Sequence, residues 1–225
     1  MDIGNGPMIY KTKIDSKTRW VVATGDKQGN WYVFDAKTGV VLNGLGLECL
    51  LPGPPVATSS GGFNLQSAFF KHKGSVRSIG NLLSSYNLQI CNTSGGVQSQ
   101  CVRYDFAGNY SAHIVAISGD GLTEIDRFTR NGTHFLGGLV IANKMVFVRD
   151  AFNKKLLVLD ATDLNNILHE HDLSAHLSGG DLGAFMALGG GNHHKKRDDI
   201  ILVGTGIFGS ATGNGMIALG LPTRN

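Results

Sequence analysis

The sequence predicts an all-β fold that is assembled from repeated, blade-like units. The first observation is the stretch at residues 20–39, which holds two short apolar strands, residues 20–24 and 31–34, each followed by a polar turn. β-branched and aromatic residues suit a half-buried pleated surface, and Gly, Asn and Asp tolerate the positive φ of tight turns. The second observation is that this unit recurs along the chain, which is typical of blade-by-blade architectures. The third is composition, because 32 glycines and five prolines fit many tight turns between short strands.

Copies of this unit organise most of the chain. Three segments resemble it: residues 145–163, residues 201–221 and, in part, residues 114–128. The first copy aligns with residues 20–39 without a gap, which pairs Val146 with Val21, Val158 with Val33, Asp160 with Asp35 and Ala161 with Ala36. We therefore expect residues 1–225 to form a single β domain.

Short apolar runs bounded by Gly, Asn, Asp and Ser predict the remaining strands. In chain order they are expected at residues 8–10, 66–70, 76–79, 102–104, 114–118, 122–128, 139–148, 156–159, 200–203 and 216–221. Three stretches between them are a charged turn at residues 11–18, a long Gly- and Pro-rich loop at residues 40–62, and a polar stretch at residues 164–176 with room for one helical turn. Long irregular loops inside compact domains are often functional.

Composition and charge exclude several classes of protein. With 42% hydrophobic and 16% charged residues, the chain has enough apolar side chains for a core, so disorder is not expected. The net charge of +3 is small and dispersed, so no nucleic-acid partner is expected. No apolar run is long enough to span a bilayer, so no membrane span is expected.

The expected location is secreted or periplasmic, although residues 1–4 do not begin a signal peptide. Three triplets match the glycosylation acceptor pattern: Asn92-Thr93-Ser94, Asn109-Tyr110-Ser111 and Asn131-Gly132-Thr133. Cys91 and Cys101 flank a polar loop, and a disulfide between them would contribute roughly 2–4 kcal/mol and leave Cys49 over. The alternative, three unpaired thiols in a cytosolic protein, stays open.

Four segments carry a resemblance to a known family. They are Asp2-Ile3-Gly4-Asn5-Gly6-Pro7, Lys27-Gln28-Gly29, Gly61-Gly62-Phe63-Asn64-Leu65, and Gly137-Gly138-Leu139 together with residues 145–160. They resemble four patterns of the quinoprotein alcohol dehydrogenases and their polyvinyl-alcohol-dehydrogenase-like relatives: W-D-[FY]-G-x-x-P, K/R-x-G before a Y-x-L-D strand, G-G-x-N-W, and a C-terminal GG…LVF…LDA run. The resemblance covers most of the chain and is poorest at residues 70–112.

The resemblance implies an eight-bladed β-propeller that binds pyrroloquinoline quinone (PQQ). A four-stranded blade takes about 40–45 residues, so we expect a partial β-propeller of about four blades, a fragment of the eight-bladed architecture that begins within a blade. Ring closure is how propellers dispose of their exposed strand edges. An open arc is therefore expected to self-associate through its first and last sheets, or to be only marginally stable.

The resemblance also implies two cofactor contacts. By position, Lys27 matches the family's turn Lys or Arg, which reaches the quinone oxygens, and Asn64 matches the Asn of G-G-x-N-W, although Leu65 replaces the Trp. A cation beside an ortho-quinone stabilises the negative charge that develops on the oxygens as hydride arrives. The alternative is that Lys27 is a solvated turn lysine and Asn64 a loop cap.

The family's calcium ligands and catalytic base lie upstream of the matched region, so no catalytic or metal-ligating residue is assigned in this chain. Two cofactor contacts without a metal and a base cannot make an alcohol dehydrogenase. We expect the C-terminal propeller segment of a quinoprotein-like oxidoreductase, inactive alone, which acts on a small-molecule alcohol if upstream blades complete it. The alternative is a non-catalytic propeller-repeat module for binding or scaffolding.

Three other patterns are interpreted as structural. G-x-G-x-x-G at residues 204–209 follows an apolar strand, but residues 210–215 have a turn composition and not the helix that a dinucleotide site needs. His169, His171 and His176 could gather a metal if they shared one face, although a polar surface loop is the favoured interpretation. Residues 193–199 are basic and then acidic, which indicates a solvated hairpin tip.

Overall fold

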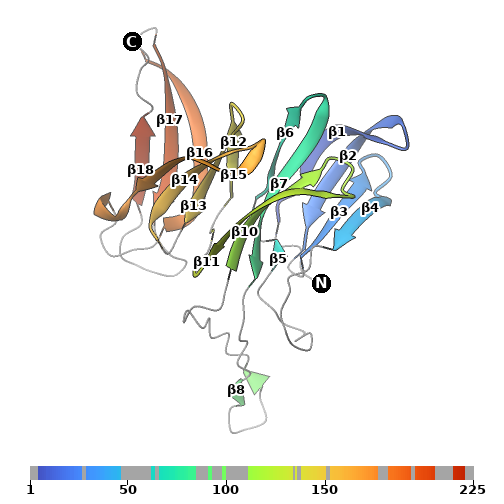
Figure 1. The fold of residues 1–225 in the computed structure, drawn as a ribbon, viewed down its shortest axis with the longest axis horizontal. Coiled ribbons are helices and arrows are strands. Elements are labelled where there is room, and N and C mark those ends of the chain that lie inside the picture. The colour runs from blue at the N-terminus through green and yellow to red at the C-terminus, as the bar shows by residue number, and fades with distance from the viewer. Residues whose placement is uncertain are drawn as a thin grey trace.

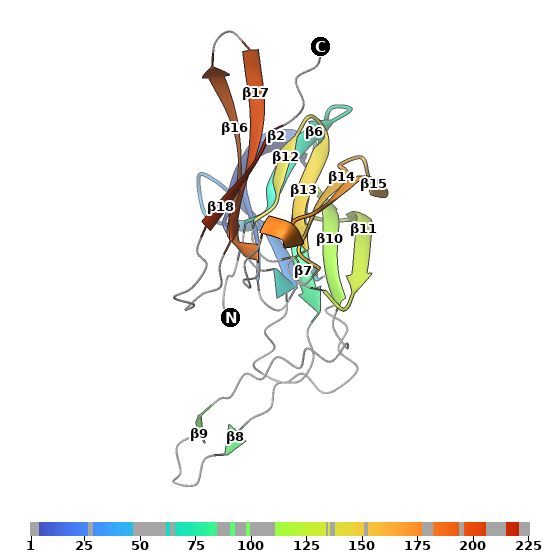
Figure 2. The same ribbon diagram turned by 90° about the vertical axis from the view of Figure 1, so that its left-hand side faces the viewer.

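The computed structural model describes residues 5–26, 29–46, 62–63, 66–84, 91–92, 98–99, 111–133, 135, 138–150, 153–176, 182–193, 196–205 and 215–220. This part of the chain is all β apart from one 3₁₀ turn, η1 (Ser174–His176). Its antiparallel sheets are arranged as an open fan, with the N-terminal and C-terminal sheets on opposite sides (Figures 1 and 2). No described helix is long and apolar enough to cross a membrane.

Blades 1 and 3 are four-stranded sheets in which neighbouring strands follow one another in the chain. Blade 1 consists of β1 (Met8–Ile14), β2 (Lys17–Gly25), β3 (Asn30–Asp35) and β4 (Val41–Gly46). Blade 3 consists of β12 (Val140–Ala142), β13 (Met145–Asp150), β14 (Lys155–Asp160) and β15 (Asp163–Asp172).

Blades 2 and 4 depart from this plan. In blade 2, β5 (Gly62–Phe63) and β6 (Ala68–His72) both pair with β7 (Ser75–Ser84), and β10 (Ser111–Ser118) and β11 (Glu124–Asn131) complete the sheet. Blade 4 contains β16 (Leu182–His193), β17 (Lys196–Thr205) and β18 (Gly215–Gly220). A separate hairpin of β8 (Cys91–Asn92) and β9 (Gln98–Ser99) projects away from the fan (Figure 2). These sheets confirm the predicted all-β, partial propeller of about four blades.

The turns of each blade gather at two opposite ends because its strands are antiparallel. The first-turn end carries the turns at residues 15–16, 73–74 and 143–144, which follow β1, β6 and β12. The second-turn end carries the connections at residues 26–29 and 151–154, which follow β2 and β13. Lys27 and Asn64 belong in the sequence to connections at the second-turn end.

Adjacent blades are held together by three apolar clusters. The cluster between blades 1 and 2 includes Tyr10, Val21, Trp31, Phe63 and Val115. The cluster between blades 2 and 3 includes Ile79, Ile114, Val146, Leu157 and Leu159. The cluster between blades 3 and 4 includes Phe147, Leu156, Leu173, Ile201 and Val203. Burial of these faces makes each blade depend on its neighbour.

Most predicted strands lie where they were expected, but several predictions were wrong. Residues 40–62 are not all loop, because Val41–Gly46 form β4. The described strands do not begin within a blade, because β1 to β4 form a four-stranded sheet. Residues 11–18 are not a charged turn, because Lys11 and Lys13 alternate with inward side chains along β1 and only Asp15 and Ser16 form the turn. Residues 139–148 are not one strand, because the chain reverses at residues 143–144, which have positive φ, and separates β12 from β13. Residues 163–172 are strand β15, and the expected helical turn is η1. The expected strand at residues 102–104 lies outside the described residues.

The repeat at residues 145–163 contains a one-residue insertion, so the gapless alignment was wrong on its first strand. In blade 1, Val21 pairs with Asp35, and Ala36 N donates to Trp20 O. In blade 3, the equivalent pair is Met145 with Asp160, and the equivalent bond runs from Ala161 N to Lys144 O. Val146 therefore takes the place of Val22, not Val21, while Val158 does match Val33. A shift of one residue moves a strand's side chains to the other face of the sheet. The same shift places Asp150 at the position of Asp26.

Two other copies of the repeat occupy different places in their blades. Residues 201–221 fall on β17 and β18, the second and third described strands of blade 4. Residues 114–128 fall on β10 and β11, which are the third and fourth strands of blade 2.

Candidate functional site

The second-turn end of blade 1 is organised by Asp26, whose side chain is fully buried. Its carboxylate accepts hydrogen bonds from the backbone N–H of Asn30 at 2.9 Å, from Asn30 Nδ2 at 2.9 Å and from the Tyr32 hydroxyl at 3.1 Å. Burial and the contact with Asp26 raise the pKa of Tyr32. An Asp directly after a strand can thus satisfy the backbone and side-chain donors of the turn that follows.

The two predicted cofactor residues, Lys27 and Asn64, lie outside the described residues, and their roles stay predictions. Their described sequence neighbours are joined directly, because Phe63 N donates to Asp26 O at 2.8 Å. The buried Phe63 ring also covers Gly25, where an added Cβ would lie 2.4 Å from the ring. Only glycine permits such a close approach. The end of β2 in blade 1 is therefore fixed against β5 in blade 2.

A buried amide ties further segments to the same region. Asn5 Nδ2 donates to Ser67 Oγ at 2.9 Å, Ser67 N donates to Asn5 Oδ1 at 3.0 Å, and Thr24 Oγ1 donates to Asn5 O at 3.0 Å. Towards blade 3, Leu139 N donates to Gln66 O at 3.2 Å. Each of the four family-like segments has a described residue in this hydrogen-bonded region: Asn5, Gly29, Phe63 and Leu139.

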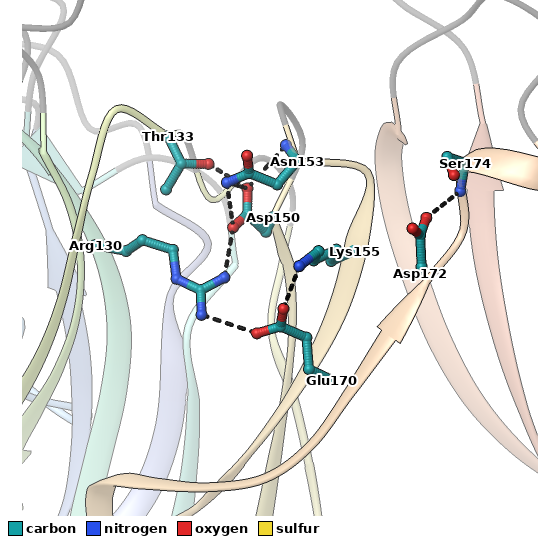
Figure 3. Close-up of polar contacts among 8 residues, drawn as sticks. All are labelled: Arg130, Thr133, Asp150, Asn153, Lys155, Glu170, Asp172 and Ser174. Atoms are coloured by element: carbon teal, nitrogen blue, oxygen red, sulfur yellow. Dashed lines mark hydrogen bonds and ion pairs between the residues drawn. The ribbon is translucent and has the colours of Figure 1, made fainter.

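In blade 3 the position of Asp26 is taken by Asp150, which is also fully buried (Figure 3). Its carboxylate accepts a hydrogen bond from Thr133 Oγ1, from Asn153 N at 3.2 Å, from Asn153 Nδ2 at 2.9 Å and from Arg130 Nη1 at 3.0 Å. Arg130 belongs to β11, so this ion pair connects blade 2 to blade 3.

Arg130 continues the network to the surface of blade 3 (Figure 3). Its Nη2 donates to Glu170 on β15 at 2.9 Å, and the Lys155 ammonium donates to the other oxygen of Glu170. The hydrogen bonds from Lys155 and Arg130 lower the pKa of Glu170. The network joins four strands from two blades, and its buried members are Asp150 and Thr133.

The sequence analysis did not single out Asp26, Asp150 or Arg130. The available signal was an acid directly after an apolar second strand in two copies of the unit. The gapless alignment concealed it, because it paired Asp26 with Ala151 in place of Asp150.

The described side chains do not fit the calcium site of the resembled family. No three His, Cys, Asp or Glu side chains gather as possible metal ligands within the described ranges. The carboxylates of Asp26 and Asp150 already accept several hydrogen bonds each. Trp31 Nε1 and the guanidinium of Arg149 are buried near this end without a hydrogen-bond partner among the described residues. Donors of that kind suit a ligand rich in carboxylates, such as PQQ, but they belong to different blades.

The remaining sequence patterns have structural positions. The rings of His169 and His171 stack on β15 with centroids 6.1 Å apart. His193 pairs with Lys196 at the turn between β16 and β17, which confirms the predicted hairpin tip. Cys91 pairs with Ser99 in the β8–β9 hairpin, whereas Cys49 and Cys101 lie outside the described residues, so the disulfide stays a prediction.

Comparison with solved structures identifies the same architecture in three dehydrogenases. The quinohemoprotein alcohol dehydrogenase from Pseudomonas putida HK5 matches with a TM-score of 0.61 and 14% identity, over 90% of this chain and 34% of that chain. A europium-containing methanol dehydrogenase matches with a TM-score of 0.59 and 14% identity, over 93% of this chain and 40% of that one. The quinohemoprotein alcohol dehydrogenase from Comamonas testosteroni matches with a TM-score of 0.53 and 14% identity, over 92% and 34%.

These matches confirm the resemblance at the level of fold. The described strands form a propeller segment like those of quinoprotein alcohol dehydrogenases, and the chain spans between a third and two fifths of their length. No protein-family model and no curated protein matches the chain. At 14% identity the likeness does not extend to the activity, which is a matter for proposal.

Proposed function

We propose that this chain is a propeller segment of a quinoprotein-like oxidoreductase that acts on small-molecule alcohols and holds PQQ together with further blades. The observation that carries the proposal is the likeness of fold over 90% or more of the chain to alcohol and methanol dehydrogenases. The meeting of four family-like segments at the second-turn end supports it. A secreted or periplasmic location belongs to the same proposal.

In this proposal Lys27 and Asn64 contact the cofactor. PQQ supplies the hydride acceptor when it is bound. Lys27 places a positive charge beside the quinone oxygens, and the Asn64 amide orients the ring by hydrogen bonding. The backbone bond between Phe63 and Asp26 supports this pairing, since it holds the two neighbouring segments together. No residue is assigned as base or metal ligand, so the chain alone is expected to be inactive.

Titration of PQQ into the chain, followed by quenching of tryptophan fluorescence, tests this proposal. Lys27→Ala and Asn64→Ala should each weaken binding about tenfold, because each removes a hydrogen bond to a charged or quinone oxygen. Lys37→Ala is the matched control, since Lys37 is exposed in the turn after β3. Absence of quenching, or equal weakening by the control, would remove the cofactor role. Turnover of ethanol by the isolated chain with an artificial electron acceptor would contradict its expected inactivity.

The second candidate function is a non-catalytic binding module. A cationic cleft at the first-turn end, away from the segments that resemble the quinoprotein family, favours it.

A further inference from the structure

A cleft of about 690 Å³ opens at the first-turn end between blades 1 and 2. Its walls come from the β1–β2 hairpin, the β6–β7 hairpin and the turn after β10. Figure 1 shows the β6–β7 turn on the side of the sheets opposite to the β8–β9 hairpin. Five of the lining residues are cationic: Lys11, Lys13, Lys71, Lys73 and Arg77. Asp120 is the one carboxylate among the lining residues.

Most of these cations have no carboxylate partner among the described residues. Four cations elsewhere in the described chain form ion pairs: Arg19, Arg127, Arg130 and Lys155. Lys13, Lys71 and Lys73 pair with no carboxylate within the described ranges. Lys11 lies over the ring of Trp20, 4.8 Å from its centroid, and so is held on the flank of blade 1. Arg77 also forms no ion pair among the described residues, and its Nη1 donates to Thr162 O at 3.2 Å. The positive charge of the cleft therefore rests mainly on Lys13, Lys71, Lys73 and Arg77.

Asp120 forms no ion pair with these lysines among the described residues, and its side chain is engaged by its own turn. Its Oδ1 accepts hydrogen bonds from Ser118 Oγ at 2.5 Å and from Leu122 N at 3.2 Å. This carboxylate closes the turn between β10 and β11.

Beneath the cleft, buried contacts hold the lining residue Gly119 in place. The Tyr10 hydroxyl donates to Gly119 O at 3.0 Å and accepts from Ser78 Oγ at 3.2 Å, and burial raises the pKa of Tyr10 to about 12. Gly119 is in close contact with both walls, since an added Cβ would lie 2.7 Å from Val76 and 2.9 Å from Thr12 Oγ1. A ligand would therefore meet a fixed surface and would not have to order it.

The positive potential extends to blade 3. The pKa of His72 is lowered, first by desolvation and then by the charges of Arg77, Lys73 and Lys144, while the charge of Asp160 acts in the opposite direction. Lys144 belongs to the turn between β12 and β13, at the same end of its blade. First turns of adjacent blades thus place cations on one side of the molecule.

We propose that this cleft binds a small multivalent oxyanion, a molecule that carries two or more phosphate, sulfate or carboxylate groups. Lys11 and Lys13 lie two apart on β1 and point the same way at a spacing of about 7 Å, and Lys71 and Lys73 come from a separate hairpin, so the lysines suit separate anionic groups better than one enclosed ion. Ammonium groups bind phosphate and sulfate as point charges. The site lies at the opposite end of the blades from Asp26 and Phe63, which are the described sequence neighbours of Lys27 and Asn64. It does not depend on the proposed function.

Isothermal titration of the full chain with inorganic tripolyphosphate at low salt tests the proposal. Each lysine removed should weaken binding about fivefold, which corresponds to the attraction of two unit charges about 4 Å apart in water. Lys71→Gln with Lys73→Gln should therefore weaken it about 25-fold. Lys37→Gln with Lys154→Gln loses the same charge at residues that do not line the cleft and should change the affinity less than twofold. Added salt should weaken binding by wild type.

The pKa of His72, measured by nuclear magnetic resonance, reports whether a ligand binds in this cleft. A bound oxyanion should raise the pKa of His72, because it offsets the nearby cations that lower it. Sucrose octasulfate and citrate, tested beside tripolyphosphate, distinguish the sulfate and carboxylate classes, and binding of any of the three at His72 supports the proposal. Failure of all three to bind, equal loss in the control pair, or an unchanged pKa of His72 would overturn it.

Discussion

Replacement of Asp150 by alanine should destabilise the protein strongly. The carboxylate is fully buried and accepts hydrogen bonds from Thr133, Asn153 and Arg130. Breaking a buried ion pair costs about 3–5 kcal/mol. The lower part of that range is expected, because the Arg130 side chain is 23% exposed and keeps its contact with Glu170. The urea slope of a chain of this size is expected to be about 2–3 kcal/mol/M, so the midpoint of unfolding, followed by tryptophan fluorescence, should fall by about 1–2 M.

Glu170→Gln is the control within the same network. Its side chain is 31% exposed, and exposed ion pairs contribute about 0–1 kcal/mol, so the urea midpoint should move by less than about 0.5 M. Asp150→Asn should fall between the two, because the amide keeps one acceptor oxygen and loses the charge. If Asp150→Ala and Glu170→Gln shifted the midpoint equally, burial would not decide the strength of this network.

Two further predictions concern pH and association. Burial lowers the pKa of His113 to about 4, so the folded state resists a proton that the unfolded chain accepts near pH 6.5. The free energy of unfolding present above pH 6.5 should therefore fall by about 3 kcal/mol towards pH 4. In a series of urea midpoints measured against pH, His113→Gln should flatten the decrease between pH 6.5 and pH 4. Val22 and Phe34 are cross-strand partners on the face of blade 1 that is turned away from blade 2, whereas their counterparts in blade 3, Val146 and Leu159, are fully buried against blade 2. We therefore expect self-association through this face, and Val22→Glu with Phe34→Glu should lower the mass measured by light scattering; an unassociated wild-type chain would contradict this.

The sequence was sufficient to predict β2, β3 and β14 because their apolar runs end at strong turn signals. It did not predict β4 and β15, because these two strands are largely exposed and their residues were taken for loops. It was also sufficient for the class of fold, because the repeats specify blades. The register of β13 was not predictable, since an extra residue in a turn leaves the similarity of the flanking strands intact. The prediction also ended β1 too early, at residue 10. Lys11 and Lys13 face outward from this strand, and their charge was taken as a sign of a turn. The candidate site was predictable only through resemblance, and the cleft lysines belong to separate hairpins that only the fold brings together.

The corrected register also explains a buried arginine at the second-turn end. Arg149 takes the position that Gly25 holds in blade 1, where the Phe63 ring from β5 fills the space against the next blade. The described strands of blade 4 include no counterpart of β5. The Arg149 side chain is therefore expected to fill the corresponding space with its own stem.

Burial at this position removes water from the charged guanidinium of Arg149. None of its three guanidinium nitrogens has a hydrogen-bond partner within the described residues, and burial lowers its pKa to about 10. An apolar side chain of similar length should fill the same space without that penalty. Arg149→Met should therefore leave the melting temperature unchanged or raise it by a few degrees, whereas Arg149→Ala should lower it because the space is then empty. If Arg149→Met lowered the melting temperature as much as Arg149→Ala, the guanidinium would have a partner, and its charge rather than its stem would hold blades 3 and 4 together.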